Sequence, residues 1–135
     1  SIPGAADAGV HDFIIRLVRD CVPIHDANTF LDGLRDLIHY TQSNYNNTYE
    51  ACNASQQTAI LEHFEATGRP FTGLIGKAQN KYLGKAFFYL LREYTVLGYC
   101  TSELGATKGL AYDPIPGSFH GCIPKAPGQR AWATK

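Results

Sequence analysis

Apolar residues recur at intervals of three and four positions in four separate stretches of this chain, which predicts four α-helices. The first predicted helix spans residues 9–21 and ends before Pro23, since proline has no backbone N–H to donate. Its apolar side consists of Val10, Phe13, Ile14, Leu17, Val18 and Cys21. The second predicted helix spans residues 26–44. Its apolar side consists of Phe30, Leu31, Leu34, Leu37, Ile38, Thr41 and Tyr45.

The polar run that follows, residues 43–53, is predicted as a loop. Asn53 and Gln56 have the spacing of a capping box, which predicts that a third helix spans residues 54–66. Gly68 then marks the end of this helix. The apolar side of the third helix consists of Ile60, Leu61 and Phe64.

The fourth predicted helix spans residues 81–97 and ends at Gly98. Its apolar side consists of Leu83, Ala86, Phe87, Leu90, Leu91, Tyr94 and Leu97, and Phe88 and Val96 widen it. A helix that is apolar over more than half of its circumference lies at the centre of a bundle or contacts a partner as well.

Residues 98–135 contain six glycines and four prolines among 38 positions, a density that regular helices and strands do not tolerate well. The same segment carries eight large side chains, namely Tyr99, Leu104, Leu110, Tyr112, Ile115, Phe119, Ile123 and Trp132. A flexible linker has no need of such side chains, so we expect an extended arm that packs on its own helices or on a partner. The residues alone leave both alternatives open. The predicted fold class is therefore all-α, an irregular four-helix domain (1–97) with a Gly/Pro/aromatic-rich C-terminal arm (98–135) of the same domain.

Twelve basic and twelve acidic residues cancel, so the net charge indicates neither a nucleic-acid partner nor an anionic membrane surface. No apolar run approaches the roughly 20 residues of a membrane-spanning helix. The sequence contains no methionine, and it begins at Ser1. We therefore expect a processed start, with an export signal upstream of Ser1.

The sequence predicts no catalytic, cofactor-binding or metal-binding residue in this chain. Its five histidines are scattered, and neither HExxH, GxSxG nor a dinucleotide-type GxGxxG occurs. Four cysteines occur without CxxC spacing, which argues against zinc, iron–sulfur and c-type haem. A weaker alternative is a small enzyme that uses Tyr112 and His120.

An even number of cysteines without metal-binding spacing favours two disulfides and an oxidising compartment. A second helix of about 19 residues would separate Cys21 from Cys52 by roughly 28 Å, whereas disulfide-bonded Cα atoms lie within about 7 Å. An up-and-down order of helices brings Cys100 to the end that holds Cys52 and leaves Cys21 for Cys122. We therefore predict Cys52–Cys100 and Cys21–Cys122. The loop of about 15 residues before the last helix leaves the opposite direction of that helix open.

The segment from Leu97 to Cys122 resembles the C-terminal signature of the gluconate 2-dehydrogenase subunit 3 family. The matching positions are Leu97, Gly98, Tyr99, Thr101, Ser102, Glu103, Gly105, Tyr112, Pro116, Gly117, Gly121 and Cys122. Cys100 departs from the pattern, because the family generally has phenylalanine there. Residues 2–14 also resemble the opening of the family, whereas the middle of the chain is only generically similar.

Members of this family are small, non-catalytic helical subunits of bacterial flavin-dependent sugar dehydrogenases. The resemblance implies that the chain binds, stabilises and escorts a large subunit of the glucose–methanol–choline (GMC) oxidoreductase type. The FAD then belongs to the partner, twin-arginine export carries both chains to the periplasm, and a cytochrome c is a candidate further subunit. The expected partner-binding residues are Tyr99, Thr101, Ser102, Gly105, Tyr112, Pro116, Gly117, Phe119 and Trp132, with the four aromatic residues as anchors. The alternative is a free-standing extracytoplasmic α-helical binding domain whose arm folds on itself.

Overall fold

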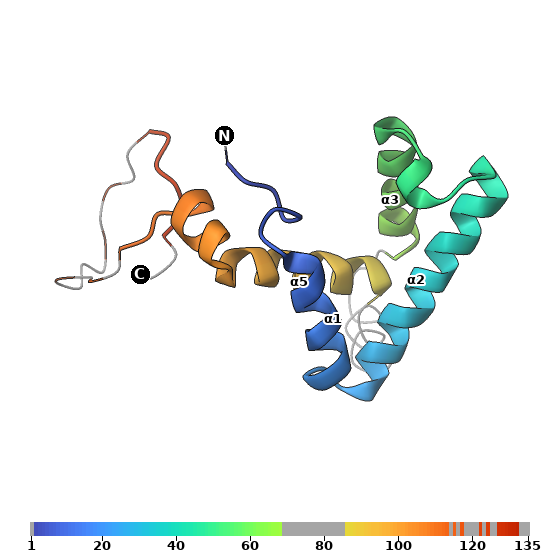
Figure 1. The fold of residues 1–135 in the computed structure, drawn as a ribbon, viewed down its shortest axis with the longest axis horizontal. Helices are drawn as coiled ribbons and strands as arrows, with labels where there is room; N and C mark the ends of the chain where they lie inside the picture. The colour runs from blue at the N-terminus through green and yellow to red at the C-terminus, as the bar shows by residue number, and fades with distance from the viewer. Residues whose placement is uncertain are drawn as a thin grey trace. The chain divides into compact units, whose positions relative to one another are not determined.

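The structure is a computed structural model that describes residues 2–68, 86–113, 115, 117, 122, 124 and 127–132 (Figure 1). Four α-helices occur in this part of the chain: α1 (Val10–Asp20), α2 (Ile24–Tyr45), α3 (Ala54–Thr67) and α5 (Phe87–Thr101). A short 3-10 helix, η1 (Tyr49–Ala51), precedes α3, and a π-helical turn, η2 (Gly105–Gly109), follows α5. The described residues contain no strand beyond one isolated bridge between Ala111 and Trp132. The all-α fold class is confirmed.

The first three predicted helices agree with α1, α2 and α3 within two residues at each end. The predicted loop between α2 and α3 contains η1, so it is more regular than its polar sequence indicated. Asn46, in the left-handed conformation with φ 48°, ends α2 and donates its N–H to the carbonyl of Gln42.

The predicted capping box at the start of α3 is confirmed. The Oδ1 atom of Asn53 accepts the backbone N–H of Gln56 at 2.9 Å, and the Oε1 atom of Gln56 accepts the backbone N–H of Asn53 at 3.0 Å. The two bonds satisfy two N–H donors that a helix start otherwise leaves open. At the other end of α3, Gly68 is the capping residue and donates its N–H to the carbonyl of Phe64.

The end of the fourth helix differs from the prediction. Residues 81–85 of the predicted helix lie outside the described residues, but α5 does not end at Gly98 and continues to Thr101. Gly98 lies against α1: a Cβ atom built on it would be 2.7 Å from Cδ1 of Phe13 and 3.0 Å from Cγ1 of Val10. This glycine therefore allows two helices to approach each other closely, and it does not break the helix.

The chain divides into two compact units. Unit 1 comprises residues 1–15 and 94–135, and unit 2 comprises residues 16–93. The predicted boundary between a domain of residues 1–97 and an arm of residues 98–135 stays a prediction. No helix among the described residues is long and apolar enough to cross a membrane.

Unit 2 is built on the packing of α3 against α2. Its buried side chains include Phe30, Leu37, Thr41, Ile60 and Phe87. The aromatic rings form a continuous cluster, in which Tyr40 stacks on His63 at 4.2 Å and Phe64 meets Phe87 edge to face at 5.9 Å. Leu31 and Ile38, on the predicted apolar side of α2, are 45% and 58% exposed. Unit 2 thus buries a narrower stripe than the apolar pattern of α2.

Candidate functional site

Tyr99, near the end of α5, connects three segments of unit 1. Its hydroxyl donates a hydrogen bond of 2.8 Å to the carbonyl of Pro3, which lies 96 positions earlier in the chain. Its ring lies on Gly109, where an added Cβ would be 2.5 Å from the hydroxyl oxygen and 2.9 Å from Cε1. Its carbonyl lies against Gly105, where an added Cβ would be 1.8 Å from the oxygen. Residues 105 and 109 are therefore glycines because any side chain there would overlap Tyr99.

Ser102 shapes the turn that follows α5. Its hydroxyl donates to the carbonyl of Tyr99 at 2.8 Å and accepts the backbone N–H of Gly105 at 3.0 Å. The N–H of Leu110 then reaches the carbonyl of Gly105 at 2.8 Å, an i→i+5 bond that closes η2. We call residues 99–110 the hinge turn.

The residues before α1 form a rolled segment that holds the acceptor of Tyr99. The N–H of Gly4 donates to Oδ2 of Asp7 at 2.9 Å, and the N–H of Ala8 donates to the carbonyl of Gly4 at 3.2 Å. Gly9 has a φ of +66°, a conformation that favours glycine, and α1 begins directly after it. The carbonyl of Pro3 is thereby held at a defined distance from the start of α1.

The described part of the arm returns to its own base, as the red and orange segments of Figure 1 show. The N–H of Ala111 donates to the carbonyl of Ala131 at 2.8 Å. The guanidinium of Arg130 donates to the carbonyl of Lys108. Gly128, with a φ of +74°, permits the turn just before this contact. Residues 130 and 131 are therefore hydrogen-bonded to the hinge turn at Lys108 and to Ala111, the residue that follows it.

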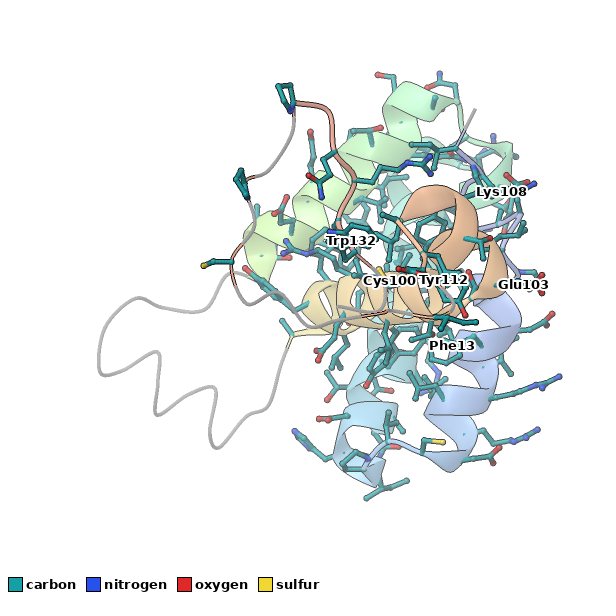
Figure 2. All side chains as sticks on the ribbon, turned by 90° about the vertical axis from the view of Figure 1, so that its left-hand side faces the viewer. Phe13, Cys100, Glu103, Lys108, Tyr112 and Trp132 are labelled. Atoms are coloured by element: carbon teal, nitrogen blue, oxygen red, sulfur yellow. The ribbon has the colours of Figure 1, made fainter. Side chains whose placement is uncertain are left out.

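Three large side chains of the described arm are exposed, although Tyr99, Leu104 and Leu110 are half-buried. Tyr112 is 47% exposed, Ile115 is 83% exposed and Trp132 is 36% exposed. Figure 2 labels Tyr112 and Trp132 beside the end of α5, where the arm begins. Isolated exposed apolar residues are common on proteins, but three of them on one short tied segment are a candidate contact surface.

The nine residues predicted to bind a partner fall into three groups. Tyr99, Ser102 and Gly105 make contacts inside unit 1, as described above. Thr101, Tyr112, Gly117 and Trp132 are exposed. Pro116 and Phe119 lie outside the described residues, as does His120 of the alternative enzyme site. A role of any of them in partner binding stays a prediction.

Sequence analysis missed several residues that build this site: Pro3, Gly98, Gly109 and Arg130. Gly98 was considered only as a helix end and as a match to the family signature, and Gly109 only in the count of glycines, whereas each faces a specific aromatic ring. A glycine is a partial signal of a close approach to the backbone, but it does not indicate which residue approaches. Pro3 and Arg130 had no such signal, because both act through contacts with distant segments.

The four cysteines differ in exposure. Cys52 is buried, Cys100 is half-buried, and Cys21 and Cys122 are exposed. All four are free thiols in this structure. Each of the two predicted disulfides would join unit 1 to unit 2, and both stay predictions.

Two side chains of unit 2, Tyr49 and Asp20, have shifted pKa values with identifiable causes. Burial raises the pKa of Tyr49, and the neighbouring Cys52 contributes to the same shift. The hydrogen bond from Arg19 lowers the pKa of the Asp20 carboxyl on the surface of unit 2. Among the described residues, no group of three or more His, Cys, Asp or Glu side chains could hold a metal ion.

Fold and site together define a small all-α protein in which Pro3, near the start of the chain, and Arg130, in the arm, both bond to residues of one glycine-rich turn. The chain belongs to the gluconate 2-dehydrogenase subunit 3 family, because the family model matches residues 1–117. The resemblance seen in the sequence is thus confirmed, and the family description makes the chain a subunit of a dehydrogenase complex. Neither a curated protein nor a solved structure matches it.

Proposed function

We propose that this chain is a non-catalytic subunit that binds, stabilises and escorts a large FAD-dependent sugar dehydrogenase of the GMC type. Its place is the periplasm, which both chains reach by twin-arginine export. The flavin and the catalytic groups belong to the large subunit, and a cytochrome c is a candidate third member. A subunit that binds only the folded partner stabilises that partner by mass action.

One observation carries the docking part of this proposal. The base of the arm is fixed by backbone hydrogen bonds, whereas Tyr112, Ile115 and Trp132 on the same arm stay exposed. Holding a segment in place before binding lowers the conformational entropy that association costs. Aromatic residues are also enriched among the side chains that contribute most to binding. We therefore assign Tyr112 and Trp132 as the main anchors for the large subunit.

The alternative is a free-standing binding domain whose arm folds on itself, and a different contact supports it. The bond from Ala111 to Ala131 returns the arm to its own base. A tagged form of this chain, purified from its source cells and run on a size-exclusion column, separates the two. Flavin absorbance on the peak supports the proposed function, and a lone peak of this chain without flavin supports the alternative.

Single substitutions test the anchors. Tyr112→Ala and Trp132→Ala should each weaken binding of the flavoprotein by about 30-fold or more, the range of interface hot spots. Leu31→Ala is the matched control, since Leu31 is similarly exposed at 45% but lies on α2 in unit 2. Wild-type affinity in both arm variants would show that the arm does not dock the partner.

The contacts of Tyr99 also determine at which residue the chain should be truncated to test the arm. Truncation after Gly98 would cut through α5 and remove Tyr99, so loss of binding could reflect loss of unit 1. Truncation after Leu110 keeps the hinge turn and removes only residues 111–135 of the arm. Escort is tested separately: in cells that lack this chain, the large subunit should stay in the cytoplasmic fraction.

A further inference from the structure

We propose that the N-terminal segment, residues 2–9, restrains the position of the arm. The contacts of Tyr99 couple this segment to the arm. The two ends of unit 1 are far apart in sequence; Tyr99 contacts Pro3 near the first end, and it contacts Gly109, next to the residue that Arg130 of the other end binds. The docking consequence rests on the proposed function, but the coupling itself is a property of this chain and can be measured on it alone.

The first step runs from the N-terminal segment to Tyr99. The carbonyl of Pro3 accepts the Tyr99 hydroxyl at 2.8 Å. Pro3 cannot drift away from α1, because the turn from Gly4 to Gly9 is closed by the side chain of Asp7 and by backbone bonds. α1 is held to α5 in turn, since Phe13 and Val10 lie against Gly98, one residue before Tyr99. The Tyr99 ring is therefore fixed both at its backbone and at its hydroxyl.

The second step runs from Tyr99 to the arm. The ring lies on Gly109, between Lys108, whose carbonyl accepts Arg130, and Leu110, the last residue of the hinge turn. Ala111, two residues after Gly109, donates to Ala131. A Tyr99 ring that is free to tilt would release the backbone at Gly109, and with it both contacts that tie the arm. The N-terminal segment thus restrains the arm through the ring of Tyr99 and through the backbone on either side of Gly109.

The hydroxyl of Tyr99 is the smallest part of these contacts that a substitution can remove. Phenylalanine keeps the ring carbons on Gly109 and loses the bond to Pro3 together with the contact of the hydroxyl oxygen with Gly109. A single hydrogen bond contributes enough to change a local opening equilibrium by about 3- to 10-fold. We therefore expect Tyr99→Phe to lower the exchange protection of the Ala111 N–H by about 3- to 10-fold.

The test is a double-mutant cycle read by amide hydrogen exchange on the free protein. Its four members are the wild-type chain, Tyr99→Phe, a chain that begins at Ala8, and that shorter chain with Tyr99→Phe. If the hydroxyl acts through Pro3, Tyr99→Phe should have its effect on Ala111 in the long chain and almost none in the short one. The N–H of Gln57, bonded to Asn53 in unit 2, should keep its protection throughout and shows that unit 2 stays folded in the variants.

Two results would overturn the inference: unchanged protection of Ala111 in Tyr99→Phe, or an equal loss in the long and short chains. Trp132 gives a second readout, because it is the single tryptophan of the chain and pairs with Ala111. Its quenching by acrylamide should rise in Tyr99→Phe and not in Tyr45→Phe, a matched change at the end of α2. If coupling is found but Tyr99→Phe binds the flavoprotein like the wild type, the N-terminal segment restrains the arm but the arm is not the docking element.

Discussion

Gly33 of α2 lies directly against the ring of Phe87 of α5. A Cβ atom built on Gly33 would be 2.2 Å from Cγ of Phe87 and 2.3 Å from its Cβ. The ring of Phe87 also lies 5.7 Å from that of Phe30 and 5.9 Å from that of Phe64. A missing side chain on α2 therefore makes the space that the aromatic cluster of unit 2 occupies.

Gly33→Ala should lower the free energy of unfolding in spite of the better helix propensity of alanine. The propensity gain is about 1 kcal/mol, whereas forcing a methyl group into a packed core costs about 1–3 kcal/mol. We expect a net loss of up to about 2 kcal/mol, measured by urea denaturation. Combining Gly33→Ala with Phe87→Leu should cost less than the sum of the two single changes, because the smaller side chain relieves the overlap. Strict additivity would contradict this packing.

Asn53→Ala should destabilise the chain by about 1 kcal/mol, the usual contribution of a helix N-cap. The reason is the loss of the bond between the side chain of Asn53 and the N–H of Gln56. Asn28→Ala, on the exposed side of α2, is the control and should be neutral or slightly stabilising. The measurement is again urea denaturation, and equal stability of the two variants would show that the capping box contributes nothing.

Gly105→Ala should be the most damaging glycine substitution in unit 1. The new methyl group would overlap the carbonyl of Tyr99, a backbone atom that cannot rotate away. We expect a loss of roughly 3 kcal/mol or more, since the backbone of η2 must shift. Gly117→Ala is the matched control, because no atom of the described residues lies within 4 Å of the position that its Cβ would take. It should stay within about 0.5 kcal/mol of the wild type.

Tyr49 should make the stability of unit 2 fall at alkaline pH. Burial raises the pKa of its phenol in the folded chain, so the unfolded chain loses this proton at a lower pH than the folded chain. The contribution of Tyr49 is fully present below the unfolded pKa of about 10 and disappears as the pH rises through the higher folded pKa. Tyr49→Phe should remove this component from the profile of unfolding free energy against pH. A profile with the same alkaline slope in both proteins would argue against a buried phenol.

Non-reducing peptide mapping of the protein from an oxidising compartment should find Cys52–Cys100 and Cys21–Cys122. Both pairs would cross-link unit 1 to unit 2, so their reduction should allow the two units to unfold at different denaturant concentrations. Peptides that join Cys21 to Cys52, or Cys100 to Cys122, would place each disulfide inside one unit and exclude the predicted order of helices. Four unmodified thiols would exclude disulfides altogether.

The sequence by itself determined the helical elements of this protein. Apolar spacing located α1, α2 and α3, and the pair Asn53 and Gln56 located the start of α3, because these signals act over one or two helical turns. The signature from Leu97 to Cys122 also identified the family, which the family model confirms over residues 1–117. These signals depend on residues that are close together in the sequence, so they can be recognised without knowing what packs against each helix.

The tertiary structure alone decided the roles of the glycines and of Tyr99. The sequence predicted that α5 would end at Gly98, because glycine weakens an isolated helix by about 1 kcal/mol. The helix continues because the contact with Phe13 and Val10 requires a residue without a side chain there. Likewise Tyr99, predicted as an anchor for a partner, bonds to Pro3 across 96 positions. A contact between such distant residues depends on the path of the whole chain, which no short sequence pattern predicts.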